Sequence, residues 1–242
     1  ETRDELRKMQ GLIRRFDTGL GQLLDILDER DLRDNTILVV TTDHGIAFPR
    51  AKGTLFDPGI ATMLFVRWPQ RCGGGLRREE MVSNVDILPT LLDAIGVPCP
   101  DRVQGQSFLP LLDGKPYAER SEVFAEKTFH DCYDPMRCIR TKNHKYICYF
   151  EKSALHRVPG DILGGGASRE LGLLHRDGGE ALYDLTSDPG ETANLVNDSD
   201  SRETLADLRC RLLQWMRETG DPLLTGPIAS PFYAKALKRL QE

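Results

Sequence analysis

The feature that most constrains this chain of 242 residues is a short apolar run that ends at a carboxylate and an imidazole. Residues 36–41, Thr-Ile-Leu-Val-Val-Thr, follow the turn-forming pair Asp34 and Asn35. Such a run predicts a buried strand in a parallel sheet. Asp43 and His44 come directly after it. Ligands of open α/β sheets bind beyond the carboxyl ends of strands, so both side chains are expected where such a fold does its chemistry.

Asp43 and His44 are a pair of residue types that suits a divalent metal, because one offers a hard anionic oxygen and the other a borderline nitrogen. The alternative is a capping aspartate and a packed histidine at a strand–loop junction. Lys52 adds a cation eight residues after His44, in a segment rich in glycine and proline. Taken alone, Lys52 is better explained as a solvated surface lysine.

Composition narrows the function classes. The chain is 40% hydrophobic and 29% charged, with a net charge of −5, which is ordinary for a soluble globular protein. The mildly acidic balance gives no electrostatic reason to expect nucleic-acid or membrane binding. No apolar run reaches about 18 residues, so no transmembrane helix is predicted. The polar start does not resemble a signal peptide.

The six cysteines lack zinc spacing, and free thiols in a reducing compartment are expected.

The order of periodic segments predicts an α/β part followed by an α+β part. Apolar residues at spacings of three and four predict an amphipathic helix over residues 1–33. A second buried strand is expected at residues 61–68. Beyond a boundary at about residue 115, residues 136–141 and 144–150 flank a tight turn and predict an antiparallel hairpin. A helix is expected at about residues 201–219. The predicted domains are therefore 1–114 and 115–242.

Two segments of the chain, residues 41–45 (Thr-Thr-Asp-His-Gly) and residues 48–60 (beginning Phe-Pro-Arg-Ala-Lys-Gly), resemble the second signature region of type I sulfatases. These enzymes belong to the alkaline phosphatase superfamily, and the loop length is most similar to the heparan N-sulfatase-like branch. Residues 182–195, Leu-Tyr-Asp-Leu through Asn-Leu, also resemble a family segment. The resemblance implies the C-terminal part of a doubly wound alkaline-phosphatase-like sheet. It also implies a smaller α+β domain with an antiparallel sheet and a C-terminal helix.

The resemblance further implies roles for individual residues. Asp43 and His44 would be ligands of Ca²⁺, or of Mg²⁺ or Mn²⁺ as in some relatives, and Lys52 would be a catalytic cation that binds the sulfate. His130 precedes the predicted hairpin, where polar residues of such proteins can approach the substrate; the alternative is a surface loop histidine. His44 departs from the family pattern, since most sulfatases have asparagine there and histidine is more usual in phosphatase-like and phosphonate-hydrolase-like members.

The formylglycine motif of type I sulfatases, Cys/Ser-x-Pro/Ala-x-Arg, is missing from the sequence. The paired N-terminal aspartates of the family metal site are missing as well. The interpretation is a fragment, the C-terminal part of a longer enzyme whose other half carries the formylglycine. The expected substrate is a sulfated carbohydrate, and the more specific expectation is N-sulfoglucosamine. The alternatives are a phosphodiester or phosphonate hydrolase of the same superfamily and a non-catalytic protein that binds sulfated glycans. The oligomeric state stays open, and the sequence fits a bacterial cytoplasmic or periplasmic enzyme as well as a lysosomal one.

The missing nucleophile yields a first prediction. The purified 242-residue chain is expected to release no sulfate from sulfated sugars, because it has no residue that can become formylglycine. Ion chromatography of released sulfate checks this, and measurable turnover by the chain alone would contradict it.

Overall fold

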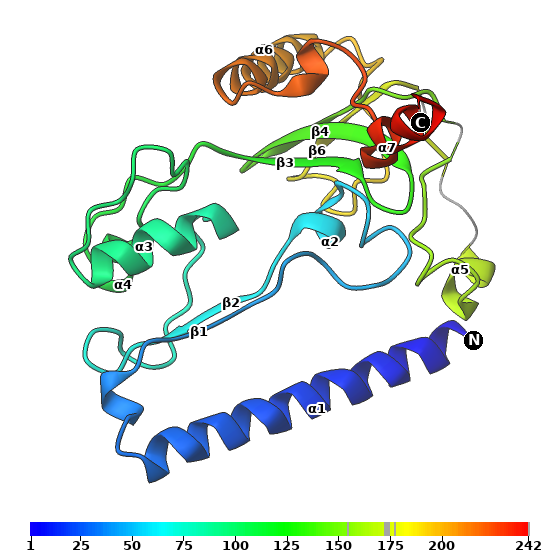
Figure 1. Ribbon diagram of the computed structural model, residues 1–242. Coiled ribbons are helices and arrows are strands. Elements are labelled where there is room, and N and C mark those ends of the chain that lie inside the picture. Colours follow the sequence, from blue (N-terminus) through cyan, green and yellow to red (C-terminus); the bar gives the residue numbers. More distant parts are fainter. Residues whose placement is uncertain (154, 172–174, 177, 242) are drawn as a thin grey trace. The chain divides into compact units, whose positions relative to one another are not determined.

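The computed structural model describes residues 1–153, 155–171, 175–176 and 178–241 (Figure 1). The chain divides into two compact units. The first unit comprises Glu1–Lys52, Asp57–Val123 and Asp161–Gly172, and the second unit comprises Gly53–Phe56, Phe124–Gly160 and Leu173–Glu242. No helix in the described part of the chain is both long enough and apolar enough to cross a membrane.

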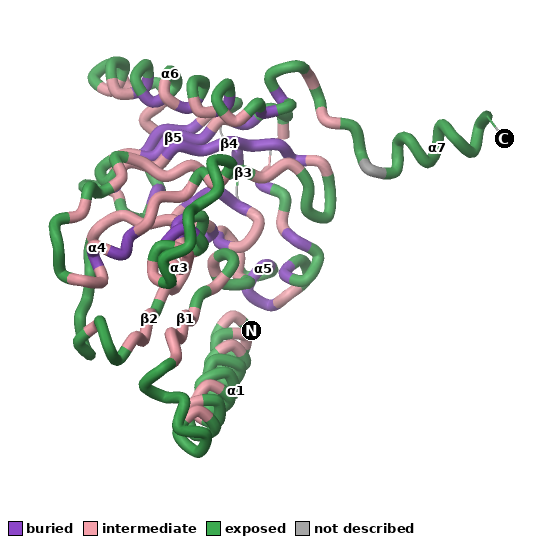
Figure 2. The backbone as a smooth tube through the Cα atoms, turned by 60° about the vertical axis from the view of Figure 1, so that its left-hand side comes forward, coloured by how far each residue is buried: buried purple, intermediate pink, exposed green. Residues whose placement is uncertain are grey.

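The first unit combines helices with a two-stranded sheet. Its elements are α1 (Thr2–Glu29), a 3₁₀ turn (Arg33–Asn35), β1 (Leu38–Thr41), α2 (Asp57–Ile60), β2 (Leu64–Arg67), a 3₁₀ turn (Asn84–Asp86), α3 (Ile87–Ala94), α4 (Leu109–Leu112) and α5 (Gly166–Leu171). The predicted N-terminal helix is confirmed, although it ends at Glu29. None of its residues is buried, and Figure 2 shows the helix exposed or half-buried along its whole length.

The strand after Asn35 forms where the sequence predicts it, but its pairing differs. β1 pairs antiparallel with β2, with Val39 opposite Val66 and Val40 opposite Phe65. The predicted parallel neighbour is therefore wrong for this pair, and so is full burial, because every β1 residue is half-buried or exposed. An apolar run shows that a strand is suited to burial, but it carries no information about the direction of the partner strand.

A buried carboxylate, Asp86, ties the middle of the first unit together. Its side chain has no exposed surface. Its oxygens accept hydrogen bonds from the backbone N–H groups of Ser83 and Gln106, both at 2.8 Å, and they form an ion pair with Arg120. The hydrogen bond to Asp86 raises the pKa of Arg120. Asp86 also forms a capping box with Ser83, and its ion pair with Arg120 joins segments 34 residues apart.

The second unit contains a four-stranded antiparallel sheet and helices. Its elements are β3 (Glu122–Phe129), β4 (Tyr133–Thr141), β5 (His144–Tyr149), β6 (Glu180–Asp184), α6 (Arg202–Glu218), a 3₁₀ turn (Pro222–Leu224) and α7 (Pro231–Gln241). The strand order is β3-β4-β5-β6. The predicted hairpin is confirmed, since β4 and β5 pair with Cys138 opposite Ile147 across the turn at residues 142–143. The mixed α/β class, the antiparallel sheet and the C-terminal helix agree with the predicted fold.

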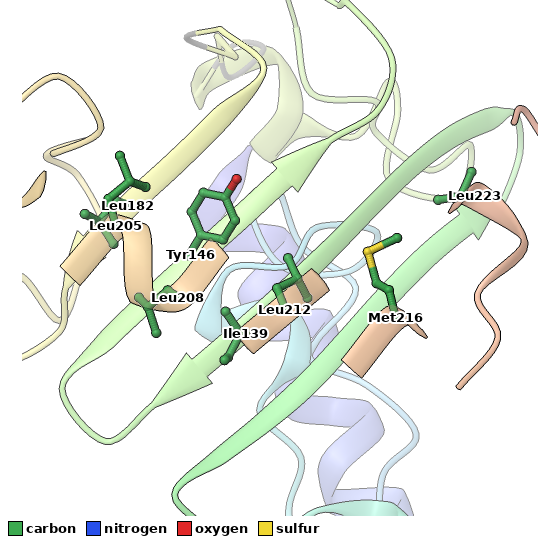
Figure 3. Close-up of a cluster of buried hydrophobic side chains, with 8 residues drawn as sticks. All are labelled: Ile139, Tyr146, Leu182, Leu205, Leu208, Leu212, Met216 and Leu223. Carbon is green, nitrogen blue, oxygen red and sulfur yellow. The ribbon is translucent and has the colours of Figure 1, made fainter. Parts of the chain in front are cut away.

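The core of the second unit lies between one face of the sheet and α6 (Figure 3). The cluster comprises Ile139, Tyr146 and Leu182 from the strands, Leu205, Leu208, Leu212 and Met216 from α6, and Leu223 after it. The α6 residues recur at spacings of three and four and therefore lie on one face of the helix. The rings of Phe124 and Trp215 stack beside them, 4.8 Å apart. Each such large apolar side chain contributes about 1.5–3 kcal/mol when fully buried.

The Asp86 contacts yield a second prediction. Asp86→Ala should lower the free energy of unfolding by about 3 kcal/mol, because it leaves Arg120 and two backbone N–H groups without their acceptor. Asp93→Ala is the matched control. It removes an exposed carboxylate whose side chain accepts one hydrogen bond, from Ser107 at 2.6 Å, so its cost should stay below about 1 kcal/mol. Urea denaturation of both variants measures the difference, and equal losses would contradict the role given to Asp86.

Candidate functional site

Asp43, His44 and Lys52 all lie on the connection between β1 and β2, which also contains α2 (Figure 1). The start of this connection is fixed by Thr42. Its hydroxyl accepts a hydrogen bond from the N–H of Met63 at 3.2 Å, and its carbonyl accepts one from the Asn84 side chain at 2.9 Å. Hydrogen bonds to both the side chain and the backbone of Thr42 therefore fix the residue that precedes Asp43.

Gly45 closes the loop immediately after His44. Its N–H donates to the carbonyl of Gly59 at 2.9 Å. A Cβ atom at position 45 would lie 1.7 Å from the carbonyl oxygen of Pro58, so no residue with a side chain fits without moving the backbone. This contact brings the two ends of the segment from Gly45 to Gly59 together, and Lys52 lies at its middle.

The side chains of Asp43 and His44 lie next to each other and face solvent. Asp43 Oδ1 accepts a hydrogen bond from the backbone N–H of His44 at 3.0 Å, and Asp43 Oδ2 lies 3.5 Å from His44 Nε2. His44 Nδ1 lies 2.7 Å from the Gly45 carbonyl, which can only accept, so Nδ1 carries a proton. In the neutral ring, Nε2 therefore keeps its lone pair beside the carboxylate. The Asp43 side chain is 86% exposed, and that of His44 is 42% exposed.

This pair fits a divalent cation as two adjacent ligands. A carboxylate oxygen and an imidazole nitrogen 3.5 Å apart can bind one ion together. A complete Ca²⁺ site needs six to eight oxygen ligands. Among the residues that the structure describes, no group of three or more His, Cys, Asp or Glu side chains is arranged to hold a metal. Asp43 and His44 thus offer part of a coordination sphere, and the other ligands would come from elsewhere.

Lys52 has its side chain turned inward. It is 18% exposed, and its Nζ donates to Asp161 Oδ2 at 2.6 Å. Its backbone N–H donates to the Ile46 carbonyl at 3.1 Å, which folds the loop back on itself. Arg50 adopts a positive φ of 65° within this bend, and Ala51 is buried. The sequence alternative of a solvated surface lysine does not hold, because the side chain is half-buried and its ammonium is paired with Asp161.

Residues Gly53–Phe56 belong to the second unit and are fixed there. Lys127 donates to the Gly53 carbonyl at 2.7 Å and to Asp134 at 2.8 Å. The ring of Phe56 is buried against His156 and Tyr183, with centroids 5.2 and 5.9 Å away. The residues that follow Lys52 are therefore held by a hydrogen bond at Gly53 and by ring packing at Phe56.

His130 lies between β3 and β4 in the second unit. Its Nδ1 is 3.1 Å from Asp131 Oδ1, and its backbone N–H donates to the Cys132 carbonyl at 3.2 Å. The other oxygen of Asp131 accepts from the N–H of Gly160. The side chain of His130 is 39% exposed, and the carboxylate of Asp131 orients its ring. Its predicted substrate-binding role stays a prediction.

The structure thus places Asp43 beside His44, directly before the closed loop from Gly45 to Gly59 that contains Lys52. Sequence reasoning missed Asp161, the partner of Lys52, which lies 109 residues further along the chain. No motif marks Asp161. The only sequence signal near it is the glycine-rich run at residues 164–166, which indicates a chain bend but no ion pair.

The contact between Gly45 and Pro58 yields a third prediction. Gly45→Ala should lower the free energy of unfolding by more than about 2 kcal/mol, because the new methyl group overlaps a backbone carbonyl that must move. Gly73→Ala is the matched control, since nothing lies within 4 Å of its Cβ position. Thermal unfolding followed by circular dichroism compares the two variants. A Gly45→Ala protein as stable as Gly73→Ala would show that the loop does not depend on this contact.

The chain is similar to known sulfatases over most of its length. Residues 45–158 match a family model described as N-sulphoglucosamine sulphohydrolase, C-terminal. An ulvan-active sulfatase of Formosa agariphila is 30% identical over 234 residues, which cover 90% of this chain and 39% of that protein. The human N-sulphoglucosamine sulphohydrolase is 28% identical over 254 residues, covering 93% of this chain and 50% of the relative. The chain therefore spans half or less of the length of these relatives.

Solved structures show the same fold. One, in complex with D-glucosamine-2-N,6-O-disulfate, superposes with a TM-score of 0.64 at 23% identity, over 85% of this chain and 39% of that one. The phosphonate monoester hydrolase of Agrobacterium radiobacter gives a TM-score of 0.64 at 26% identity, over 84% of this chain and 39% of the other. In sequence and in fold, the chain therefore matches the C-terminal portion of sulfatases of the alkaline phosphatase superfamily.

Proposed function

We propose that this chain is the C-terminal part of an enzyme that releases sulfate from a sulfated sugar by hydrolysis. The observation that carries the proposal is the closed loop from Gly45 to Gly59. Asp43 and His44 lie directly before this loop, and Lys52, whose side chain is 18% exposed, lies at its middle. Lys52 and His130 both lie within the residues that match the N-sulphoglucosamine sulphohydrolase model.

Lys52 is proposed to bind and polarise the sulfate group. Hydrogen bonds from an ammonium to anionic oxygens are among the strong ones in proteins. They gain further strength where water is excluded, as around a side chain that is only 18% exposed. Charge develops on the sulfate during transfer, and a preorganised cation stabilises it there.

Asp43 and His44 are proposed to hold a divalent cation, Ca²⁺ or alternatively Mg²⁺ or Mn²⁺, together with ligands from outside this chain. Held by Asp43 and His44, such an ion would supply Lewis-acid stabilisation of charge on the sulfate oxygens. The Gly45 carbonyl fixes the ring of His44 through Nδ1, which directs Nε2 toward the carboxylate side. The nucleophile, a formylglycine, is proposed to lie in a part of the enzyme outside this chain.

The proposed substrate is an amino sugar that carries an N-sulfate. Support comes from the human relative, named an N-sulphoglucosamine sulphohydrolase, and from the structural neighbour that holds a glucosamine disulfate. His130 is proposed to contact the sugar, since Asp131 holds its ring in place while its edge stays accessible. Because Nδ1 faces the Asp131 carboxylate, Nε2 of the neutral ring can accept from a sugar hydroxyl, and Nε2–H of the protonated ring can donate to a sulfate oxygen.

A second candidate function is hydrolysis of phosphonate or phosphodiester bonds. His44 beside Asp43 favours it, and so does the fold shared with a phosphonate monoester hydrolase at 26% identity. A third candidate, a non-catalytic protein that binds sulfated glycans, requires that no nucleophile exists anywhere in the native product. Both can be separated from a sulfatase by experiment.

The fourth prediction concerns the native gene product. Its intact mass and peptide map should show a longer chain with a Cys-x-Pro-x-Arg-type peptide converted to formylglycine. That product should release sulfate from N-sulfoglucosamine faster than it releases phenol from a phenyl phosphonate. The reverse preference would favour the phosphonate hydrolase. A product without the motif and without formylglycine would favour the non-catalytic protein that binds sulfated glycans.

The same native product tests Lys52. Lys52→Ala should lower kcat/KM for the sulfated sugar by about 10²–10³, the usual effect of removing one group that stabilises developing charge. Lys8→Ala, an exposed lysine of α1, is the control and should leave kcat/KM unchanged. Equal activity of the two variants would remove Lys52 from the proposed site.

A further inference from the structure

The ammonium of Lys52 is already engaged by a carboxylate of the first unit. Asp161 Oδ2 lies 2.6 Å from Lys52 Nζ, although 109 residues separate the two in sequence. Both groups belong to the same compact unit, to which the chain returns at residue 161. No part of the proposed reaction uses Asp161.

The segment that carries Asp161 is anchored at several points. Ile162 is buried, and its carbonyl accepts hydrogen bonds from the Gly165 N–H at 3.0 Å and from the Ser168 hydroxyl at 2.9 Å. Glu5 of α1 accepts hydrogen bonds from the N–H groups of Gly166 and Ala167, the latter at 3.1 Å. These bonds hold the start of α5 against α1 and leave Asp161 directed at Lys52.

Two glycines next to Asp161 suit this anchoring. A Cβ atom on Gly165 would lie 2.6 Å from the carboxylate of Glu5, and Gly164 has a positive φ of 87°. Glycine at position 165 leaves room for the Glu5 carboxylate, and glycine at position 164 adopts the positive φ without strain. The segment that carries Asp161 is therefore held in a defined position, and this position brings Asp161 to Lys52.

We propose that Asp161 is a positioning residue that occupies the anion-binding position on Lys52 until a sulfate group replaces it. This inference rests on the proposed function, in which Lys52 binds the sulfate. A carboxylate and a sulfate offer the same kind of anionic oxygen acceptor to an ammonium. Binding of the sulfate group therefore requires exchange of one anion for the other.

The burial of the two groups suits such an exchange. The Lys52 side chain is 18% exposed, so an unpaired ammonium there would be costly, and Asp161 offsets that cost. The Asp161 side chain is 49% exposed, so its carboxylate can return to water at little cost when it is displaced. Asp161 would hold the Lys52 side chain in place. It would also raise the sulfate concentration that is needed to fill the anion-binding position on Lys52.

The test measures how inorganic sulfate protects Lys52 of the full 242-residue chain from acylation, with peptide mass spectrometry as the site-specific readout. Asp161→Asn should lower the sulfate concentration that gives half-protection by about fivefold at low ionic strength, because the competing charge is gone. The difference should shrink at about 0.5 M sodium chloride, where charges are screened.

Three further variants make the result specific. Asp161→Glu should stay within about twofold of the unmodified chain, because it restores the carboxylate. Asp28→Asn removes another ion-paired carboxylate of the first unit, the partner of Arg33, and controls for net charge. Asp161→Ser gives the same expectation as Asp161→Asn and replaces it if the amide variant fails to fold.

The outcomes separate this inference from the proposed function. Sulfate protection of Lys52 that is unchanged or weaker in Asp161→Asn and Asp161→Ser overturns the role of Asp161 while leaving Lys52 as an anion site. Absence of protection in the unmodified chain and in every variant contradicts both. Protection that appears only when Asp161 is neutralised supports both.

Discussion

The close approach of Gly45 to the backbone of Pro58 and Gly59 is the constraint on which the site loop depends. It joins the two ends of a 15-residue segment at a point where no Cβ fits. Asp43 and His44 lie just before this point, and Lys52 lies within the segment it closes. A loop closed in this way loses less conformational entropy when it binds a ligand than an open one would. The chemistry proposed for these residues therefore starts from backbone packing.

Buried carboxylates with paired cations stabilise each unit separately. In the first unit, Asp86 links two backbone segments and Arg120 without any exposed surface. In the second unit, Asp134 is held by Lys127 and Arg176, both at 2.8 Å. Burial alone would raise the pKa of Asp134, but the hydrogen bonds and charges of Lys127 and Arg176 lower it overall. Lys127 also holds the Gly53 carbonyl, so this network reaches the residue next to Lys52.

Local patterns predicted most elements correctly because they depend on neighbouring residues. The turn at residues 142–143 gives the β4–β5 hairpin, and the spacing of Leu205, Leu208 and Leu212 gives the buried face of α6. The direction of the partner of β1 was not predictable, since β1 is apolar on both faces and an apolar strand accepts either orientation. The burial of Lys52 was missed for a related reason, because a lysine in a glycine- and proline-rich segment has the same local pattern whether it is solvated or paired.

The sequence by itself determined the residue types at the end of β1, the short span that keeps Asp43, His44 and Lys52 together, and the resemblance that links them to sulfatases. Neighbours along a chain stay close in any fold, so such proximity survives without tertiary information. Only the tertiary structure decided that Asp161 meets Lys52, that Arg120 meets Asp86, and that Gly45 touches Pro58. These contacts join segments that lie apart in sequence. They form because packing closes the chain over them, a cooperative outcome that no local pattern encodes.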